Sequence, residues 1–428
     1  MGFPQSMVHS TIRTIARLAA AALVVACGAG ALAQSSINDV LKQGGGAEWR
    51  DGFDTASGGA ATVRTSTPIL SPVIVEKLQA AIAQYTAIVT RGGWPQVPTA
   101  KPLRLGVRDP AVVVLRQRLT ISGDLNATNG VPEVFDTYVD EGVKRFQARH
   151  GIQSDGVVGQ STFAALNVPA NVRLAQLATN LTRLKMLTSK LPARFVAVNI
   201  PAATVEAVEG GVVVSRHIAV VGKVDRPSPL VNSKITEINF HPYWTVPASI
   251  IKKDLIPLIQ QDPNYLTEYR IRIYDQKGNE LNPAKINWNS DEATRYQCRQ
   301  DPFEENSLGT VKINFPSPQG VYMHDTPHKG LFVDDARFDS SGCVRVQNIR
   351  ELIVWLLKDT PGWTRDKIDA ELRGNDRHDV KLPSPVALFW TYITAWAATD
   401  GVVNFREDIY NLDGLEAYTA SAVPAQPL

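Results

Sequence analysis

Cysteine is scarce in this sequence of 428 residues. It has three cysteines, and only Cys298 and Cys343 lie beyond the N-terminal apolar stretch. Two cysteines are too few for a disulfide scaffold, and two alternatives stay open: one bridge between them, or a reduced and reactive Cys343. Cys298 lies in no recognisable motif and is left unassigned.

An excess of charge of one sign is also missing, as are clusters of metal-ligating residues. The net charge is +2, which gives no electrostatic reason to expect nucleic acid as a partner. No group of histidine, cysteine and carboxylate residues has the spacing of metal ligands. We therefore expect neither a metal nor a cofactor.

Long apolar runs are confined to the N-terminus. Residues 1–33 carry two arginines, an apolar run and a final Ala-Leu-Ala site, a pattern typical of a cleaved secretory signal peptide. Cys27 follows Val-Val-Ala and resembles a bacterial lipobox, so a lipoprotein anchored through Cys27 is the alternative. In both cases we expect the protein to work in a periplasm. The most apolar later segment, 385–398, is too short to span a membrane and reads as a buried strand.

The N-terminal half of the mature chain is predicted to be helical after an irregular start. Residues 34–70 are rich in glycine, serine, alanine and threonine and predict a flexible segment. A helical scaffold segment is expected over 71–100. Leucines at spacings of three and four predict a connecting helix over 170–192.

Residues 101–169 predict three short helices separated by glycine turns. This segment resembles the peptidoglycan-binding domain 1 family. The resemblance is carried by Leu103, Gly106, Asp109, Val112, Leu115, Arg116, Leu119, Val143, Phe146, Gln147, Gly151, Asp155, Gly156, Gly159, Thr162, Ala165, Leu166 and Asn167. It implies a small bundle that binds peptidoglycan glycan, and it names no ligand-contact residue.

From residue 193 the apolar period changes to two, which predicts a mainly β domain over 193–375 with a hairpin turn at Glu209-Gly210-Gly211. Residues 250 to about 307 interrupt the strands with a helix-like stretch and many turn residues. We expect this insertion to cap the domain, and a passive surface elaboration is the alternative. Residues 376–428 are expected to form a C-terminal extension with a strand that packs on the scaffold.

The chemistry is concentrated in residues 322–346. A thiol nucleophile needs a base, donors for the oxyanion and a backbone that exposes the sulfur. Cys343 follows a Ser-Ser-Gly turn, and His324 lies 19 positions upstream at a predicted strand end. If the strand that ends at His324 and the strand that follows Cys343 are neighbours, imidazole and thiol can meet, with the amides of Gly342 and Cys343 aimed at a carbonyl oxygen.

Plainer interpretations exist for each of these residues. A lone cysteine in a β domain is usually a small buried hydrophobe, and a lone histidine is usually structural. His328 is an alternative base, but its surrounding sequence Thr-Pro-His-Lys-Gly predicts a loop. Downstream, Asn348 and Glu351 are predicted to cap the following helix as a capping box.

The region is similar to the YkuD-type catalytic domain of the L,D-transpeptidases, whose signature is a histidine followed by S-H-G-C-x-R. His324, Cys343 and Arg345 occupy the matching positions, and Ser341 stands where the family usually has a histidine. The match is closest to the large periplasmic enzymes that carry a peptidoglycan-binding module and an inserted capping subdomain. The shared text is "MHDTP", "SSGCVRV", "HPYWTVP" and "NSLG", and the resemblance extends over roughly residues 72–415.

The resemblance implies an α+β multidomain protein that joins peptidoglycan stems. Cys343 would attack the carbonyl between diaminopimelate and terminal D-Ala, His324 would protonate the leaving amine, and a second stem's amine would resolve the thioester to a 3→3 cross-link. The implied donor groove is lined by Arg345, Tyr322, Ser341 and Trp244. The alternatives are an L,D-carboxypeptidase, with water as acceptor, and a non-catalytic wall-binding scaffold. Other wall synthases are further candidate partners.

Overall fold

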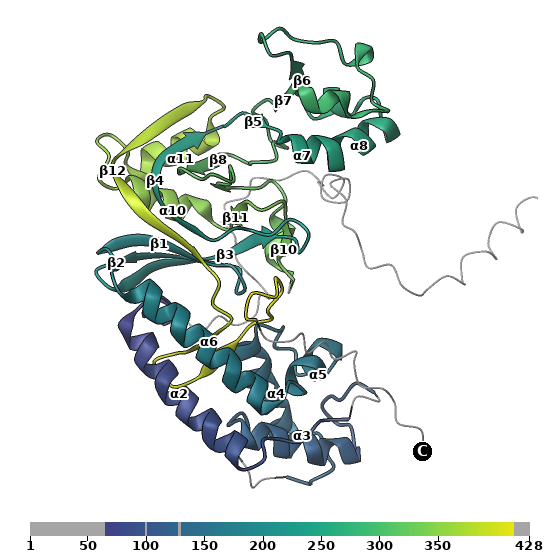
Figure 1. Cartoon of the computed structure of the whole chain (residues 1–428), viewed down its shortest axis with the longest axis vertical. Coiled ribbons are helices and arrows are strands. Elements are labelled where there is room, and N and C mark those ends of the chain that lie inside the picture. Colours follow the sequence, from purple (N-terminus) through teal and green to yellow (C-terminus); the bar gives the residue numbers. More distant parts are fainter. Residues whose placement is uncertain (1–64, 99–100, 127–129, 335, 415–428) are drawn as a thin grey trace, which may run out of the picture.

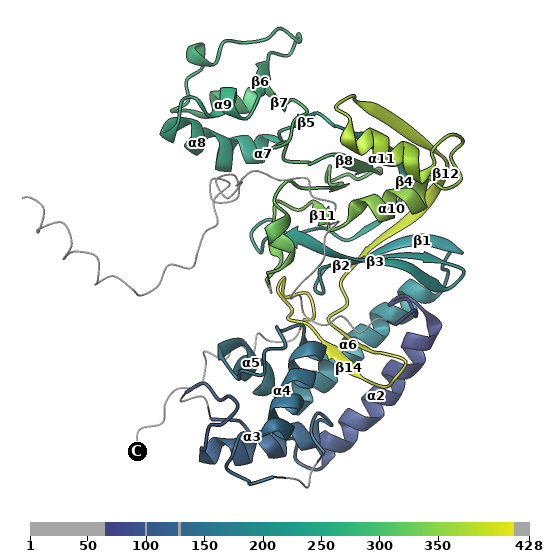
Figure 2. The ribbon, with the colours of Figure 1, turned by 180° about the vertical axis from the view of Figure 1, so that it is seen from behind.

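The computed structural model describes residues 65–98, 101–126, 130–334 and 336–414, and it is an α+β protein. Figures 1 and 2 show a helical part at one end, a β domain in the middle and a small cap at the other end. The described residues do not include the expected signal peptide, 1–33, with its Cys27. They also leave out most of the segment 34–70. Residues 69 and 70, which the sequence places in that segment, are buried against the β domain.

The helical part contains the predicted scaffold helices and the predicted bundle. α2 begins at Pro72 behind the side-chain cap of Ser71, ends at Thr90, and packs against α6 (Ala170–Thr188). The bundle has its own apolar core and consists of α3 (Pro110–Ile121), α4 (Thr137–His150) and α5 (Gln160–Leu166). The sequence-based prediction of these five helices is confirmed.

The β domain is a nine-stranded sheet in the order β10-β3-β11-β9-β8-β4-β12-β1-β2, and β2 also pairs with β3, so eight of the strands close into a ring. The strands are β1 (Arg194–Asn199), β2 (Thr204–Glu209), β3 (Val212–Gly222), β4 (Val231–Phe240), β8 (Val311–Asn314), β9 (Met323–His324), β10 (Phe338–Ser340), β11 (Val344–Val346) and β12 (His378–Thr391). Gly210 and Gly211 form the predicted β2–β3 turn, both at positive φ.

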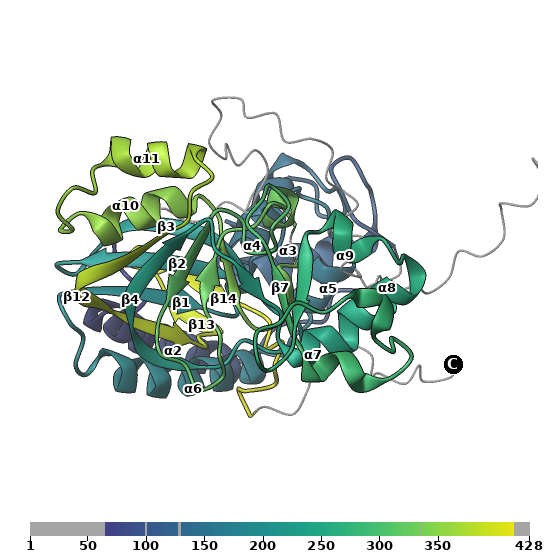
Figure 3. The ribbon, with the colours of Figure 1, turned by 90° about the horizontal axis from the view of Figure 1, so that it is seen from above.

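Alternation along the strands divides their side chains between two environments. The inner face makes one apolar core with the helices α10 (Ile349–Leu357) and α11 (Arg365–Arg373). Outward-facing residues of β1 and β12, such as Phe195 and Phe389, pack instead with α2 and α6. In Figure 3 the two pairs of helices lie on opposite sides of the β domain. The outer face of β4, β8, β9 and β11 is left for polar residues.

The predicted insertion is a separate cap with its own apolar cluster from Trp244 to Leu308. Its three-stranded sheet has the strand order β5 (Trp244–Thr245), β7 (Gln297–Gln300) and β6 (Ile271–Tyr274). The helices are α7 (Ala248–Ile250), a π turn at Ile251–Leu255, α8 (Ile256–Gln261), α9 (Tyr265–Glu268), and 3₁₀ turns at Pro283–Lys285 and Asp291–Arg295. The 3₁₀ turn Lys329–Phe332 follows β9 in the β domain.

The C-terminal extension differs from the prediction. β12 lies inside the ring, antiparallel to β4 and parallel to β1, so the β domain extends past residue 375 to Thr391. The strand does pack on the scaffold as predicted, through Phe389, but its backbone is paired on both sides by neighbouring strands of the ring. The hairpin of β13 (Ala395–Ala397) and β14 (Val403–Phe405) also packs with the scaffold helices. Over the ranges the structure describes, no helix has the length and apolar character needed to cross a membrane.

Candidate active site

The neighbouring strands β9 and β11 bring the predicted residues together. They run parallel, with Met323 opposite Val344 and His324 opposite Arg345. Met323 and Val344 face the inner core. Because side chains alternate, Tyr322, His324, Cys343 and Arg345 share the outer face. The condition on which the sequence-based hypothesis depended, neighbouring strands at this turn, is fulfilled.

His324 is buried and its orientation is set by one hydrogen bond. Its Nδ1 donates to the carbonyl oxygen of Asp325 at 2.5 Å, which leaves Nε2 as the acceptor. Burial, with the positive charge of Arg345, lowers the pKa of His324 to about 3. The imidazole is therefore neutral at physiological pH, as a general base must be.

Asp325 holds the end of β9 in place. Its carboxylate accepts hydrogen bonds from the amide and hydroxyl of Thr310, at 3.0 and 2.9 Å, and pairs with Lys329 at 2.5 Å. A side chain at Gly309 would place a Cβ 2.5 Å from this carboxylate, and Gly309 has φ +59°. The segment Leu-Gly-Thr at residues 308–310 therefore gives the Asp325 carboxylate both the space and the hydrogen-bond donors that hold it.

Cys343 is half-buried and is not in a disulfide; of the two cysteines the structure describes, both are free. Burial raises the pKa of the Cys343 thiol to about 11, although the backbone amide and hydroxyl of Tyr322 donate to the sulfur and oppose this. Cys298 lies in the cap core, where burial raises its pKa to about 12. The alternative of a bridge between these cysteines is wrong.

Two of the predicted roles are not supported by the geometry. The Gly342 amide, expected to serve the oxyanion, donates to Ser340 Oγ at 3.1 Å, and Ser340 Oγ donates to the Cys343 carbonyl at 2.5 Å. Gly342 does supply the backbone freedom expected of it, with φ +107°. Trp244, expected in the donor groove, is 8% exposed and its Nε1 donates to Tyr322 Oη at 3.1 Å. Trp244 therefore holds the Tyr322 hydroxyl in position.

Arg345 has the properties of an anion anchor. Its Nε and Nη1 are buried and have no hydrogen-bond partner among the described residues. Burial lowers its pKa, while the charges of Asp339 and Cys343 raise it. Two unsatisfied guanidinium donors beside the nucleophile favour a carboxylate ligand. His328 Nε2 is likewise buried and unpartnered in the described part of the chain.

Sequence reasoning missed Lys312. It lies opposite His324 in the β8–β9 register, and its Nζ lies 4.4 Å from the centre of the Tyr322 ring. Its charge is one of the influences that lower the pKa of Cys343. The alternating apolar residues of β8 were the available signal, because they place Lys312 on the same outer face as the residues of β9.

The predicted capping box after the nucleophile is wrong in its hydrogen bonds. Asn348 does lie at the N-cap position just before α10, as predicted, but it has φ +47° and makes no side-chain capping bond. Glu351 pairs with Arg365, at 2.7 Å and 2.5 Å, and with Arg350 at 2.7 Å. The two arginines outcompete a backbone amide for this carboxylate because charge-assisted bonds are stronger.

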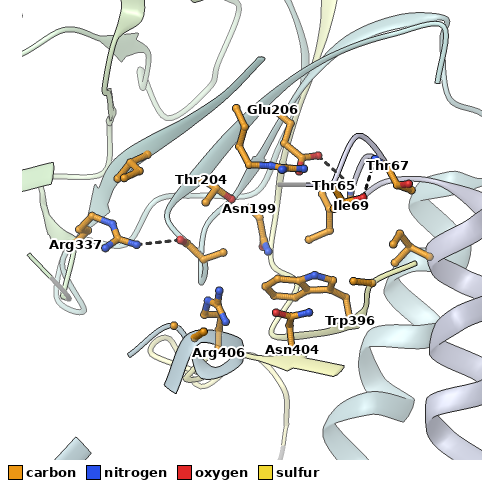
Figure 4. A pocket seen from close by; sticks show the side chains of 17 residues that line it. Thr65, Thr67, Ile69, Asn199, Thr204, Glu206, Arg337, Trp396, Asn404 and Arg406 are labelled. Carbon is orange, nitrogen blue, oxygen red and sulfur yellow. Dashed lines mark hydrogen bonds and ion pairs between the residues drawn. The ribbon is translucent and has the colours of Figure 1, made fainter. Parts of the chain in front are cut away.

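A cavity of about 80 Å³ lies elsewhere, between the bundle, the β domain and the C-terminal hairpin (Figure 4). Its lining includes Arg337, Trp396 and Arg406 but neither Cys343 nor His324. It is therefore separate from the candidate active site. Among the residues that have described positions, no three or more metal-ligating side chains lie close enough together to hold a metal ion.

We expect Tyr322→Phe to lower kcat/KM for acyl transfer about tenfold, since it removes one hydrogen bond to the sulfur and leaves Trp244 Nε1 without its acceptor. Steady-state kinetics on a donor stem checks this. Trp244→Phe, which keeps the Tyr322 hydroxyl, is the matched control and should have the smaller effect. Equal kinetics of Tyr322→Phe and the unmodified protein would show that the hydroxyl has no role.

The pKa values predict how the free thiol responds to pH. With a Cys343 pKa of about 11 and a His324 pKa of about 3, thiol and imidazole are both neutral between these values. The thiolate fraction, and with it the rate of iodoacetamide alkylation of Cys343, should rise about tenfold per pH unit from pH 7 to 10. A plateau already present at pH 6–7 would instead reveal a preformed thiolate–imidazolium pair.

Two segments of the chain match known protein families. Residues 193–364 match the family described as L,D-transpeptidase catalytic domain, YkuD, and residues 108–166 match the family described as "Putative peptidoglycan binding domain". A Haemophilus influenzae protein named "Putative L,D-transpeptidase" is 36% identical over 239 residues, which are 56% of this chain and 48% of that protein. This chain thus spans about half the length of that curated relative.

Other matches are more distant. The N-acetylmuramoyl-L-alanine amidase CwlM of Mycobacterium tuberculosis is 35% identical over 80 residues, 17% of this chain and 20% of that protein. A crystal structure of an L,D-transpeptidase from Xylanimonas cellulosilytica has 16% identity and a TM-score of 0.21, covering 69% of this chain and 99% of that one. Residues 193–364 of this chain therefore belong to the YkuD family of L,D-transpeptidase catalytic domains, and residues 108–166 to the peptidoglycan-binding domain 1 family.

Proposed function

We propose that this protein is a periplasmic L,D-transpeptidase that forms 3→3 cross-links between diaminopimelate residues of peptidoglycan stems through a thioester on Cys343. The observation that carries the proposal is the set of Cys343, His324, Tyr322 and Arg345 on one outer face of β9 and β11, next to the cap. This set supplies a nucleophile, a neutral base, a donor to the sulfur and an anion anchor.

The first half-reaction makes the acyl-enzyme. The Cys343 proton moves to His324 Nε2 as the sulfur attacks the carbonyl between diaminopimelate and terminal D-Ala. The proton transfer accompanies the attack, because the thiol pKa of about 11 lies far above the imidazole pKa of about 3. The carbon–nitrogen bond then breaks, D-Ala leaves with the proton from His324, and the stem remains on the sulfur as a thioester.

The second half-reaction uses the same groups in reverse. The side-chain amine of an acceptor stem's diaminopimelate attacks the thioester carbonyl and gives its proton to His324. The carbon–sulfur bond breaks, and the thiolate recovers the proton. Arg345, whose buried Nε and Nη1 have no hydrogen-bond partner in the part of the chain that the structure describes, is assigned to a carboxylate of the donor stem.

The remaining parts of the chain fit the same substrate. The bundle of α3, α4 and α5 is assigned to holding the glycan near the β domain, which raises the local concentration of stems. Export through the N-terminal signal peptide is part of this proposal, because the substrate lies outside the cytoplasm. Other wall synthases are proposed partners.

Product analysis tests the function. Purified protein is incubated with disaccharide-tetrapeptides, and the products are separated and identified by mass spectrometry. The proposal predicts a cross-linked dimer together with released D-Ala. Tripeptide as the only product would make the enzyme an L,D-carboxypeptidase, and unchanged tetrapeptide with retained binding would make it a wall-binding scaffold.

A further inference from the structure

The cap is attached to the β domain on both sides of Cys343. On one side, Trp244 of the cap cluster donates to Tyr322, whose hydroxyl bonds the sulfur of Cys343. On the other side, the loop 223–230 between β3 and β4 connects the nucleophile turn to the cap helix. The second attachment consists of charged side chains that the mechanism above does not use.

The loop 223–230 and the nucleophile turn form one hydrogen-bonded unit. Ser228 Oγ donates to the Gly342 carbonyl at 2.9 Å and accepts from the Gly222 amide at 2.9 Å. A Cβ on Gly222 would lie 2.3 Å from the Arg226 carbonyl oxygen, so only glycine permits this approach. Tyr410 also donates to the Gly222 carbonyl, at 2.5 Å. The position of Arg226 is therefore fixed relative to Cys343.

Arg226 extends from this unit to the cap. Its Nη1 and Nη2 bind the two carboxylate oxygens of Asp254, at 2.5 and 2.9 Å, and Nη1 also donates to Ser341 Oγ at 3.0 Å. The side chains of Arg226 and Asp254 are each 18% exposed. A two-point pair at this burial is shielded from water and is stronger than an ordinary surface ion pair.

We propose that Arg226 is a positioning residue that holds the cap closed beside Cys343 by binding Asp254 of the cap and Ser341 of the nucleophile turn. We call these three residues the latch. Its consequence for catalysis rests on the proposed function: the donor stem enters when the latch opens, and closure then places the cap against the bound stem. The latch also gives Ser341 a role at the position where the wider family has a histidine.

Access to Cys343 in the absence of substrate tests the latch without depending on the transpeptidase reaction. The full chain is treated with iodoacetamide or with a bulky polyethylene-glycol maleimide, and mass spectrometry follows the peptide that contains Cys343. Arg226→Ala and Asp254→Ala should each raise the rate with the bulky reagent about tenfold, and the rate with iodoacetamide less. The double variant should match the singles, because both remove the same contact.

The controls separate a latch from a general loss of stability. Lys252→Ala removes a cap ion pair with Asp291 that does not touch the nucleophile turn, and it should leave the rates unchanged. The charge swap Arg226→Asp with Asp254→Arg should restore slow modification. Hydrogen exchange of residues 248–308 should rise in the single and double alanine variants and should not rise in the charge swap. Where one single variant fails to fold, the other gives the same test. Unchanged rates in the single variants, or effects that simply multiply in the double variant, overturn the proposal.

Discussion

Cys343→Ala is expected to abolish acyl transfer, with a fall in kcat/KM on the order of 10⁴-fold or more, because no other described side chain at the site is a thiol. The substitution removes one sulfur from a half-buried position, and the strands β9 and β11 remain paired through their backbones. Stem binding should therefore be retained. Steady-state kinetics with a tetrapeptide donor and a binding measurement on the same variant check both halves of this expectation.

Cys298→Ala is the matched control for this loss. Cys298 is buried in the cap core and burial raises its pKa to about 12, so it holds a proton at working pH and lies outside the site. Its loss should leave the chemical step intact and lower only the stability of the cap. Cross-linking at an undiminished rate in Cys343→Ala would remove Cys343 from the mechanism.

His324→Asn should lower kcat/KM by about 10²- to 10⁴-fold, the usual contribution of a general base. Asparagine can keep a donor at the Nδ1 position for the Asp325 carbonyl, but it has no equivalent of the Nε2 acceptor. The variant therefore removes proton transfer while preserving the local hydrogen bond. The alkylation of Cys343 at pH 10 or above should persist, because there hydroxide supplies the thiolate.

His328→Asn separates the two histidines of this segment. His328 immediately precedes the 3₁₀ turn after β9, and burial lowers its pKa to about 4. If His324 is the base, this variant should retain activity within a few-fold of the unmodified protein. A loss as large as that of His324→Asn would mean that the base has been assigned to the wrong histidine.

Local patterns in the sequence predicted most of what positions the site. The change of apolar period at residue 193 and the Gly210-Gly211 turn correspond to the start of the β domain and to the β2–β3 hairpin. The separation of His324 and Cys343 along the sequence corresponds to the pairing of β9 with β11. These features depend on nearby residues and on alternation, which a sequence displays directly. The helices of the bundle were predictable for the same reason.

What the sequence could not give depends on side-chain direction and on distant partners. Arg226 lies 28 positions from Asp254 and 115 from Ser341, so no periodicity relates them. The Gly342 amide is directed to Ser340 by the turn's own hydrogen bonds, and Trp244 points at Tyr322 because the cap folds around it. β12 joins the ring through pairing with β1, nearly 200 residues earlier in the chain.

Mass spectrometry of the intact protein during turnover tests the central claim most directly. With excess disaccharide-tetrapeptide whose diaminopimelate side-chain amine is blocked by acetylation, so that it cannot act as acceptor, the proposed mechanism predicts a covalent adduct whose mass equals the donor minus D-Ala. The adduct should map to Cys343, be cleaved by hydroxylamine as a thioester, and be absent from Cys343→Ala. An adduct on another residue, or cross-linked product formed with no adduct on Cys343 at any time, would contradict it.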